Sequence, residues 1–342
     1  MVRTAGARSH GCGMRRRLCP GPGWDGISHG WRHCADCRSS RAADGAGRAQ
    51  RGRCPRHPRH AARQGRRDGR PLSHRGAARE TARRHAGGLA KRLLMELTAI
   101  IPSYGQVALL RTCLTMLERA LALTKLPGTA IVVVDNGTLT PYRLAEFGVA
   151  SVRIVRFDRP HSFSTACNRG ACEMPARRYL FLNNDVFIHP EAIAEMLDVM
   201  REHKAGIAGT RLVLPDDTIQ HCGVKFDGGE RGPYHQHHGR PTAIVARATS
   251  FPQAVTGAAL LIDHAVFTAL GGFDEAFPFG YEDADLCLRA RHLGIRIACA
   301  QGQDSLHLES FSDRRPDRHQ ASRRLFFERW RGRYAIDGDE NG

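Results

Sequence analysis

Short apolar runs alternate with amphipathic stretches from residue 97 onward. Leu97 to Ile101 is an apolar run that stops at Pro102, and hydrophobic residues then recur at helical spacing between residues 107 and 121. The same alternation predicts strands at 130–134, 152–157 and 178–182, a helix beginning near 162 and a helix over 190–203. Continuous apolar strands that alternate with helices are typical of a mostly parallel sheet flanked by helices. We therefore predict an α/β fold.

The second half of the chain has a less regular pattern. After Gly206 we expect shorter strands and loops, and then a strand over 254–262, a helix beginning near Asp283, a strand over 295–300 and an Arg-rich C-terminal helix. No internal repeat is visible, and no run of about 18 apolar residues is long enough for a membrane span. The pattern predicts one α/β domain over residues 95–335, followed by an acidic tail over 336–342.

Residues 1–94 have a composition of their own. They hold 23 of the 51 Lys and Arg residues but five of the 34 Asp and Glu residues, so the net charge of +17 originates there. Residues 95–342 carry 28 basic and 29 acidic residues, which argues against bulk nucleic-acid binding by the folded part. A segment so rich in Arg, Gly, Pro and Ala buries too little apolar area to offset its ordering entropy, so we predict disorder.

Residues 1–94 allow two other interpretations. Cys34 and Cys37 form a CxxC beside His33, but no second ligand pair accompanies them, so a zinc site is disfavoured. The composition of this segment matches no recognisable targeting signal. The segment is also explained as translation upstream of the true start, with Met95 opening the protein.

Polar residues follow three of the predicted strands. The strand ends carry Pro102-Ser103-Tyr104, Asp135-Asn136 and Asn183-Asn184-Asp185. Asn and Asp are ordinary turn formers after strands, but ligands of open parallel sheets bind at the carboxyl ends of the strands. An Asp after the second strand can accept hydrogen bonds from a base edge or a ribose, and an Asp after the fourth can hold a divalent cation against a diphosphate.

Ordered motifs extend this pattern over residues 97–330. They are Ile100-Ile101-Pro102-Ser103-Tyr104, Val133-Val134-Asp135-Asn136-Gly137, Phe163 through Asn168-Arg169-Gly170, Phe181-Leu182-Asn183-Asn184-Asp185, Val255-Thr256-Gly257-Ala258, Gly272-Phe273-Asp274-Glu275 and Glu282-Asp283-Ala284-Asp285-Leu286. In this order and spacing the sequence resembles the family 2 glycosyltransferases, which have the GT-A fold. The Leu-Asn-Asn-Asp strand end is similar to that of rhamnosyltransferase-like members of surface polysaccharide assembly.

The resemblance implies roles for residues of this chain. Asp283 would be the catalytic base, Asp185 and His307 would be metal ligands, and Glu282 and Gly257 would lie on the acceptor side. The implied donor-nucleotide residues are Pro102, Ser103, Tyr104, Asp135, Asn168, Arg169 and Asn183.

Asn183 departs from the family pattern, because many relatives have Asp there. Asparagine can bond a ribose hydroxyl but gives a cation no negative charge, so metal affinity would depend on Asp185, His307 and the diphosphate. The expected cofactor is a divalent cation, Mn²⁺ or Mg²⁺, since the nitrogen of His suits manganese and the oxygens suit both.

The implied reaction is sugar transfer from a nucleotide-diphosphate donor to a hydroxyl. Negative charge grows on the leaving diphosphate, where a cation stabilises it, and a carboxylate removes the acceptor's proton. Direct attack would invert the anomeric centre. Asp283 precedes a helical run, so capping is its alternative role; we assign capping to Asp285, which also forms an i,i+4 pair with Arg289.

Two further features point elsewhere. Gly209-Thr210-Arg211-Leu212 resembles the phosphate loop of sugar nucleotidyltransferases but lies mid-chain, and residues 212–223 look instead like the transferase family's hairpin after its fifth strand. His235, His237 and His238 suggest a metal cluster, but the surrounding Gly and Pro residues favour a mobile loop, so we interpret residues 227–250 as an acceptor-side loop ordered by substrate.

The sequence therefore predicts an inverting, metal-dependent glycosyltransferase that uses a nucleotide-diphospho-sugar donor and a glycan or lipid-linked acceptor. The alternatives are a sugar-phosphate nucleotidyltransferase and a non-catalytic binding protein with a basic N-terminal arm. The six cysteines after residue 94 lack ligand spacing, which fits a reduced, cytoplasmic setting. Peripheral attachment to the inner face of the membrane stays open, and no nucleic-acid partner is expected.

Overall fold

A computed structural model describes residues 95–149, 152–228, 231–309 and 316–337 of the chain. The disorder predicted for residues 1–94, the CxxC at Cys34 and Cys37, and most of the acidic tail lie outside these residues.

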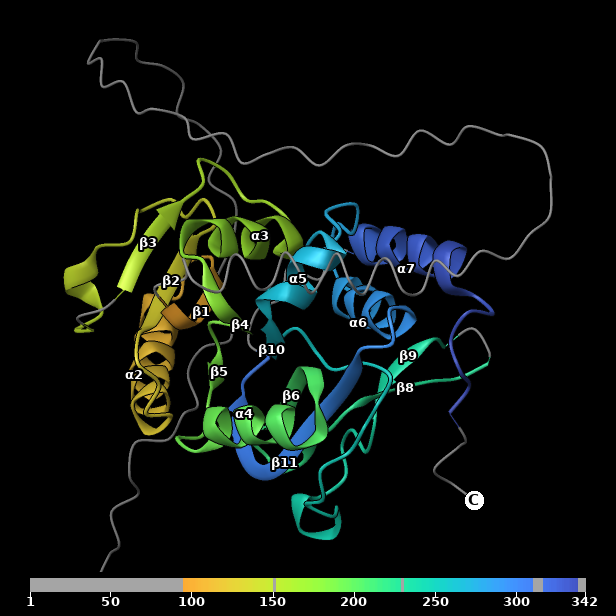
Figure 1. The fold of residues 1–342 in the computed structure, drawn as a ribbon. Helices are drawn as coiled ribbons and strands as arrows, with labels where there is room; N and C mark the ends of the chain where they lie inside the picture. The colour runs from red at the N-terminus through yellow and green to blue at the C-terminus, as the bar shows by residue number, and fades with distance from the viewer. Residues whose placement is uncertain (1–94, 150–151, 229–230, 310–315, 338–342) are drawn as a thin grey trace, which may run out of the picture. The chain divides into compact units, whose positions relative to one another are not determined.

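A nine-stranded mixed sheet forms the centre of the fold (Figure 1). Its strand order is β3-β2-β1-β4-β10-β6-β11-β5, with β7 paired to β6. The strands are β1 (Met95–Ser103), β2 (Thr129–Asp135), β3 (Val152–Arg156), β4 (Ala176–Leu182), β5 (Val186–Phe187), β6 (Ala205–Val213), β7 (Ile219–His221), β10 (Ala259–Asp263) and β11 (Arg296–His307). A separate pair, β8 (Val224–Phe226) and β9 (Pro233–His235), is antiparallel.

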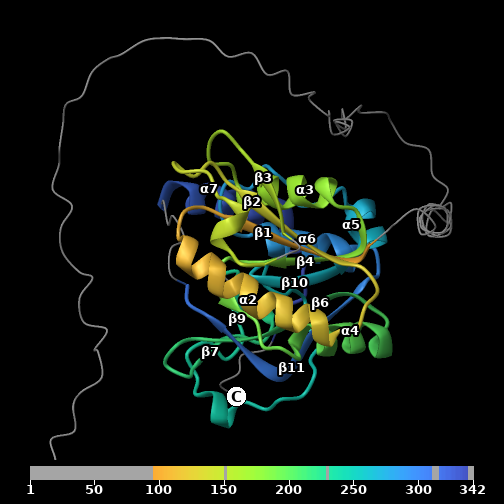
Figure 2. The same cartoon turned by 90° about the vertical axis from the view of Figure 1, so that its left-hand side faces the viewer.

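Helices cover both faces of the sheet, as Figures 1 and 2 show. They are α2 (Val107–Leu123), α3 (Phe163–Glu173), α4 (Ala192–His203), α5 (His264–Leu270), α6 (Glu282–His292) and α7 (Pro316–Trp330), with short 3₁₀ turns η1 (Leu144–Glu146) and η2 (Thr242–Ile244). Residues of α2 and α4 pack into one hydrophobic core, and residues of α3, α5, α6 and α7 pack into the other. The predicted α/β class with a helix-flanked sheet is confirmed.

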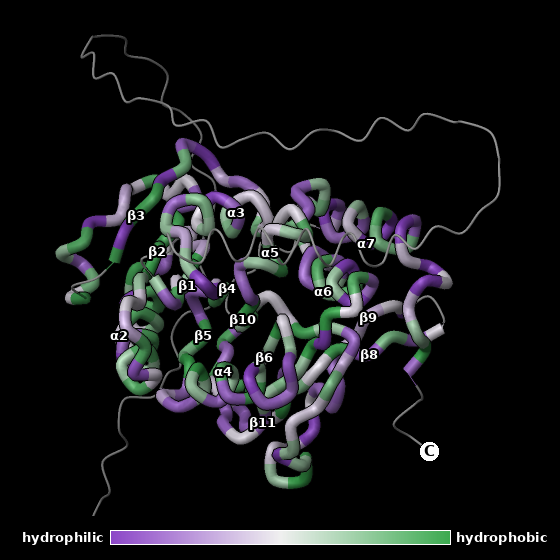
Figure 3. Tube along the Cα trace, viewed as in Figure 1, coloured by the Kyte–Doolittle hydropathy of each residue, from purple (hydrophilic) through white to green (hydrophobic). Residues whose placement is uncertain are grey.

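Alternation along the strands explains the two cores. In β1, Leu97, Ala99 and Ile101 belong to the core under α2, whereas Ile100 belongs to the core under α3. Successive side chains of a strand point to opposite faces, so a strand with a helix layer on each side needs apolar residues at nearly every position. Figure 3 shows the resulting hydrophobic stretches along β2, β10 and α2.

The second half of the sheet differs from the sequence prediction. β6 is a fully buried nine-residue strand, where shorter strands and loops were expected beyond Gly206. Its small residues account for the weak signal: Gly209 lies against Val255, where an added Cβ would come within 2.7 Å of that side chain. The predicted hairpin after this strand is confirmed by the antiparallel pairing of β6 with β7.

The boundaries of two other strands and of one helix also differ from the prediction. The strand expected over 254–262 is β10, which begins at Ala259, because residues 254–258 instead bond to loops and side chains. The strand expected over 295–300 continues to His307 through a register shift between Ala300 and Ser305. The helix expected from Pro190 begins at Ala192.

Strand direction brings the candidate residues to one edge of the sheet. β1, β2 and β4 are parallel, and β10 runs antiparallel between β4 and β6, so β10 begins where β4 ends. β11 is parallel to β6, so its last residue, His307, reaches the same edge. The expected convergence of polar strand ends therefore follows from the topology.

Candidate active site

Asp185 and His307 meet at the end of β4. The Oδ1 atom of Asp185 lies 3.3 Å from Nε2 of His307, and the amide of Asn183 lies 3.5 Å from the same nitrogen. The short ladder between β5 and β11 causes this proximity: His307 pairs with Val186, and the Leu308 N–H donates to the Asp185 carbonyl at 3.1 Å. Both side chains are nearly buried.

These residues fit a divalent cation by their chemistry. A carboxylate, an imidazole and an amide are ligands that Mn²⁺ and Mg²⁺ accept, and neighbouring ligands of one such ion lie about 3 Å apart. Among the described residues, no group of three or more His, Cys, Asp and Glu side chains is arranged for a metal ion. Two protein ligands with an amide would leave further coordination positions to a diphosphate and to water.

The segment Thr256–Ala258 connects this cluster to the candidate base. The Asn183 N–H donates to the Ala258 carbonyl at 2.9 Å, and the Gly257 N–H donates to Oδ2 of Asp283 at 2.8 Å. The Ala284 N–H also bonds to the Asp283 carboxylate, at 2.8 Å. Two consecutive residues before β10, Gly257 and Ala258, thus position the carboxylate of Asp283 and the strand end at Asn183.

Gly257 leaves little space beside this carboxylate. A Cβ at this position would lie 3.2 Å from a ring carbon of Phe163 and 3.4 Å from Cβ of Asp283. A side chain here would therefore press on the candidate base from one side and on α3 from the other.

Glu282, beside Asp283, is buried. Burial, followed by the neighbouring charge of Asp283, raises the pKa of its carboxyl to about 8, well above the ordinary 4.5. Its Oε2 atom has no hydrogen-bond partner among the described residues. The adjacent acids of this motif are therefore in different environments, one buried and one held by two amides.

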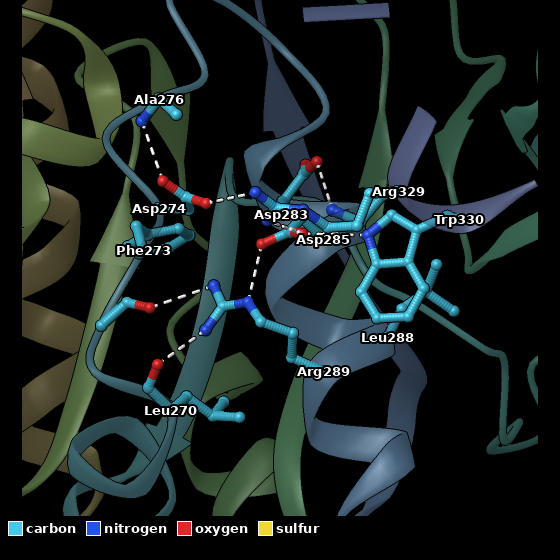
Figure 4. A network of polar contacts seen from close by, with 12 residues as sticks. Leu270, Phe273, Asp274, Ala276, Asp283, Asp285, Leu288, Arg289, Arg329 and Trp330 are labelled. Carbon is cyan, nitrogen blue, oxygen red and sulfur yellow. Dashed lines mark hydrogen bonds and ion pairs between the residues drawn. The ribbon is translucent and has the colours of Figure 1, made fainter. Parts of the chain in front are cut away.

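Asp285 is the centre of a buried ion-pair network (Figure 4). Its carboxylate, 0% exposed, accepts from Arg289 at 2.7 Å, from Arg329 at 2.6 Å and from the Trp330 indole at 2.9 Å. Arg289 and Arg329 in turn bond to Leu270 and Gly272 carbonyls and to the carboxylate of Asp274. The i,i+4 pair expected with Arg289 is present, but the capping role expected of Asp285 is wrong. Its carboxylate accepts from the Arg289, Arg329 and Trp330 side chains and not from backbone N–H groups of α6, so it joins α6 to α7.

Four of the expected nucleotide residues, Pro102, Ser103, Tyr104 and Asp135, lie at the ends of β1 and β2. Ser103 and Asp135 are register partners across the parallel ladder. Ser103 shares a hydrogen bond with Tyr142 at 2.9 Å and accepts one from Asn184 at 3.0 Å. Pro102 is half-buried, whereas Tyr104 has 53% of its surface exposed, which leaves its ring accessible for stacking.

Asp135 is already fully bonded. It is buried, accepts from the Thr138 amide at 3.0 Å and hydroxyl at 2.6 Å, and contacts the Tyr142 amide at 3.4 Å. Arg156 from β3 completes the set through an ion pair. Asp135 therefore reaches a nucleotide only by exchanging one of these partners.

Asn168 and Arg169 of α3 make contacts within the protein. The Asn168 amide donates to the Phe273 carbonyl and to Glu275, both at 2.9 Å, and accepts from the Phe273 N–H at 3.0 Å. Arg169 lies 3.5 Å from Glu173 in an i,i+4 pair. The Asn168 bonds hold α3 against the Gly272–Glu275 motif.

A pair of imidazoles was missed by the sequence analysis. His221 Nδ1 lies 2.8 Å from His235 Nδ1, which joins β7 to β9. The sequence predicts a mobile loop over 227–250, but His235 lies in β9 within that segment, and β9 pairs with β8, which precedes it. No local signal connects residues 14 positions apart, so the pair depends on the pairing of strands.

The segment Gly209-Thr210-Arg211-Leu212 is part of β6 and not a phosphate loop. Arg211 is fully buried, donates to the carbonyls of Thr242 and Val245, and forms a 2.8 Å ion pair with Asp304. Arg211 therefore anchors the residues of η2 to the sheet.

Comparisons with known proteins show the family and the fold of this chain. Residues 95–327 match the family described as glycosyltransferase-like family 2. The O-antigen biosynthesis protein RfbC of Myxococcus xanthus is 29% identical over 64% of this chain and 18% of its own length. The uncharacterized protein y4gI of Sinorhizobium fredii (strain NBRC 101917 / NGR234) is 30% identical over 62% of this chain and 24% of its own length.

The matched region covers about a fifth to a quarter of the length of these relatives. Among solved structures, GalNAc-T7, crystallised with UDP, GalNAc and Mn²⁺, superposes with a TM-score of 0.51 at 13% identity, over 68% of this chain and 48% of that one. This likeness shows the GT-A fold. None of the described helices has the length and apolar character needed to cross a membrane.

Proposed function

Because this chain belongs to the glycosyltransferase-like family 2, we propose that it moves a sugar from a nucleotide-diphosphate donor to a hydroxyl of a glycan or lipid-linked acceptor, with inversion. Residues 95–335 form the transferase domain in this proposal.

One observation carries the proposal. Residues Thr256–Ala258 hold the strand end at Asn183 through Ala258 and the carboxylate of Asp283 through Gly257. A group suited to a donor diphosphate and a group suited to an acceptor proton are thus fixed by adjacent peptide units. Positioning of reacting groups in this way supplies a large part of an enzyme's rate enhancement.

Asp283 would act as the general base. Its carboxylate, held by the Gly257 and Ala284 amides, retains lone pairs for the proton of an acceptor hydroxyl. The hydroxyl oxygen would attack the anomeric carbon on the face opposite the diphosphate, and this single displacement inverts the centre.

The donor side would be built from the other strand ends. Tyr104 would stack on the base, Asp135 and Asn183 would bond the nucleoside, and Pro102 and Ser103 would shape the end of β1. Asp185 and His307 would hold a Mn²⁺ or Mg²⁺ ion, which supplies charge stabilisation for the leaving diphosphate. Arg169 would contribute positive charge from α3, and Asn168 would keep that helix in place.

The relatives support a substrate class. RfbC is an O-antigen biosynthesis protein, so we propose that the acceptor belongs to a surface polysaccharide under assembly and that the donor sugar is a hexose or deoxyhexose, as in rhamnosyltransferase-like enzymes. The site of action would be the cytoplasm or the inner face of the membrane.

The nucleotidyltransferase alternative lacks its main support. Its candidate phosphate loop is the buried strand β6, and Arg211 is committed to Asp304 and to carbonyl groups. The product also separates the two reactions, because nucleotidyl transfer releases pyrophosphate and sugar transfer releases a nucleoside diphosphate.

Asp283→Asn tests the proposal. The variant keeps the size of the side chain but not its basicity, so nucleoside diphosphate release should fall by about 10² to 10⁴ with donor affinity unchanged in calorimetry. Asp198→Asn, on the exposed face of α4, is the matched control. A fully active Asp283→Asn enzyme would exclude Asp283 as the base, and release of pyrophosphate would favour the alternative reaction.

A further inference from the structure

The two imidazoles of His221 and His235 share a single proton along their contact. Their Nδ1 atoms face each other at 2.8 Å, so one nitrogen must donate and the other must accept. His221 is fully buried, and burial lowers its pKa well below the ordinary value. Burial also lowers the pKa of His235, although the nearby Asp283 carboxylate opposes that effect. Both rings are therefore neutral near pH 7.

A backbone amide decides which ring donates. The Thr256 N–H points to Nε2 of His221 at 3.4 Å, so this nitrogen accepts and the proton of His221 sits on Nδ1. His221 then donates to Nδ1 of His235, which leaves the proton of His235 on Nε2. The hydrogen-bond chain thus fixes His235 in the tautomer that presents an Nε2–H group.

The His235 ring lies on the same side of the site as the candidate base. The Asp283 carboxylate is near enough to raise the pKa of His235 against the larger effect of burial. Adjacent amides hold the two sides together: Thr256 bonds to His221, and Gly257 bonds to Asp283. Among the described residues, none forms a hydrogen bond with Nε2 of His235.

We propose that His235 binds the acceptor sugar, donating its Nε2–H to an oxygen next to the attacking hydroxyl, and that His221 is the positioning residue that sets its tautomer. The inference rests on the proposed function and adds a specificity-determining residue to it. A neutral donor orients an acceptor oxygen without competing with Asp283 for the proton of the attacking hydroxyl.

The chemistry of the pair disfavours a metal site here. In both rings Nδ1 is used within the pair, and Nε2 of His221 is used by Thr256. Only Nε2 of His235 remains in the pair. One nitrogen suits a hydrogen bond to a sugar oxygen better than a metal ion, which needs several ligands.

Kinetics with p-nitrophenyl hexosides as acceptors test the proposal. His235→Phe removes the donor and should raise the KM for the glycoside about 2- to 10-fold, the effect of one neutral hydrogen bond, while the donor KM and the slow hydrolysis of the donor without acceptor stay constant. His235→Gln retains an N–H group at a similar reach and should recover much of the loss. His292→Phe, at the exposed C-terminal end of α6 and outside residues 227–250, is the matched control.

Nitrogen chemical shifts of the imidazoles test the tautomers directly. In ¹⁵N-labelled protein, His235 should carry its proton on Nε2 and His221 on Nδ1; the reverse assignment would overturn the proposal, as would an unchanged acceptor KM in an active His235→Phe enzyme. If the wild-type chain releases no diphosphate from any nucleotide-sugar, the proposed function is wrong. The nitrogen chemical shifts still test the hydrogen-bond direction between His221 and His235 in that case.

Discussion

Glu282 and Asp283 are neighbours in sequence with different surroundings. Glu282 is buried without a partner for Oε2 among the described residues, whereas Asp283 accepts two backbone hydrogen bonds. The cost of burying a charge makes the carboxyl of Glu282 retain its proton to higher pH. At the scale of single residues, environment therefore separates two acids that sequence alone presents as equivalent.

This difference predicts a pH-dependent stability. The pKa of Glu282 is raised from 4.5 to about 8, so its contribution to stability is fully present below about pH 4.5 and is lost as the pH rises through about 8. Glu282→Gln cannot ionise, so its melting temperature should fall less than that of the wild type between pH 6 and pH 9. Thermal melts across this range provide the measurement, and parallel curves for the two proteins would contradict the assignment.

Metal dependence should follow Asp185 more strongly than His307. Asp185 supplies the only carboxylate of the Asn183, Asp185 and His307 cluster. Asp185→Ala should therefore lower diphosphate release by orders of magnitude with little rescue by excess Mn²⁺, and His307→Ala should have a milder effect. Chelator-treated wild-type enzyme that keeps full activity without added cation would refute both ligand assignments.

At the scale of elements, α6 and α7 depend on one carboxylate. Asp285 neutralises Arg289 and Arg329 and also binds the indole of Trp330. Removal of one member of a buried ion pair leaves uncompensated charge, which typically costs about 3–5 kcal/mol. The Glu282–His292 helix would lose its attachment to α7, and with it the support of the candidate base.

Asp285→Asn should accordingly lower the free energy of unfolding by roughly this amount in urea titrations. Asp198→Asn removes an exposed pair with Arg201 and should cost less than about 1 kcal/mol. Equal stability of the two variants would show that the Asp285 network contributes little. An inactive but folded Asp285→Asn enzyme would instead give this residue a direct part in the chemistry.

The helices and strands that the sequence predicts correctly are those with a clear pattern of apolar residues within the element itself. Helical spacing predicted α2, and apolar runs that end in polar turns predicted the strands of the β1, β2 and β4 half with their candidate residues. β6 was missed because small residues that allow close packing, such as Gly209, weaken its apolar pattern. The extension of β11 to His307 depends on pairing with Val186, 121 positions away in the sequence, which no local pattern encodes.

Pairing between distant strands also explains why the sequence did not predict the contacts that hold the candidate site. The bonds from Thr256 and Gly257 to His221 and Asp283 form because β10 inserts antiparallel between β4 and β6. Turn residues such as Asn183 and Asp185 can be recognised in the sequence by their residue type. Hydrogen bonds from backbone amides, such as those of Thr256 and Gly257, leave no such pattern. Motif order could therefore suggest the carboxylates but not the contacts that hold them.

At the scale of the whole molecule, the described residues contain both cores and all of the candidate site residues. The core under α2 and the core under α3 are built from residues between Met95 and Tyr334. Residues 95–342 carry a net charge of −1, so they lack the excess basic charge of residues 1–94. The last prediction follows from this distribution.

A protein that begins at Met95 should fold and transfer sugar as well as the full chain does. The described residues from Met95 onward form both cores, and stability depends mainly on buried apolar area. Melting temperature and diphosphate release, measured for both lengths in the same buffer, should therefore agree, whereas salt-sensitive binding to anionic vesicles should be confined to the full chain because its excess charge lies before residue 95. A shortened protein that is unfolded or inactive would show that residues 1–94 belong to the catalytic unit, and vesicle binding by the full chain with no sugar transfer by either length would favour the binding-protein alternative.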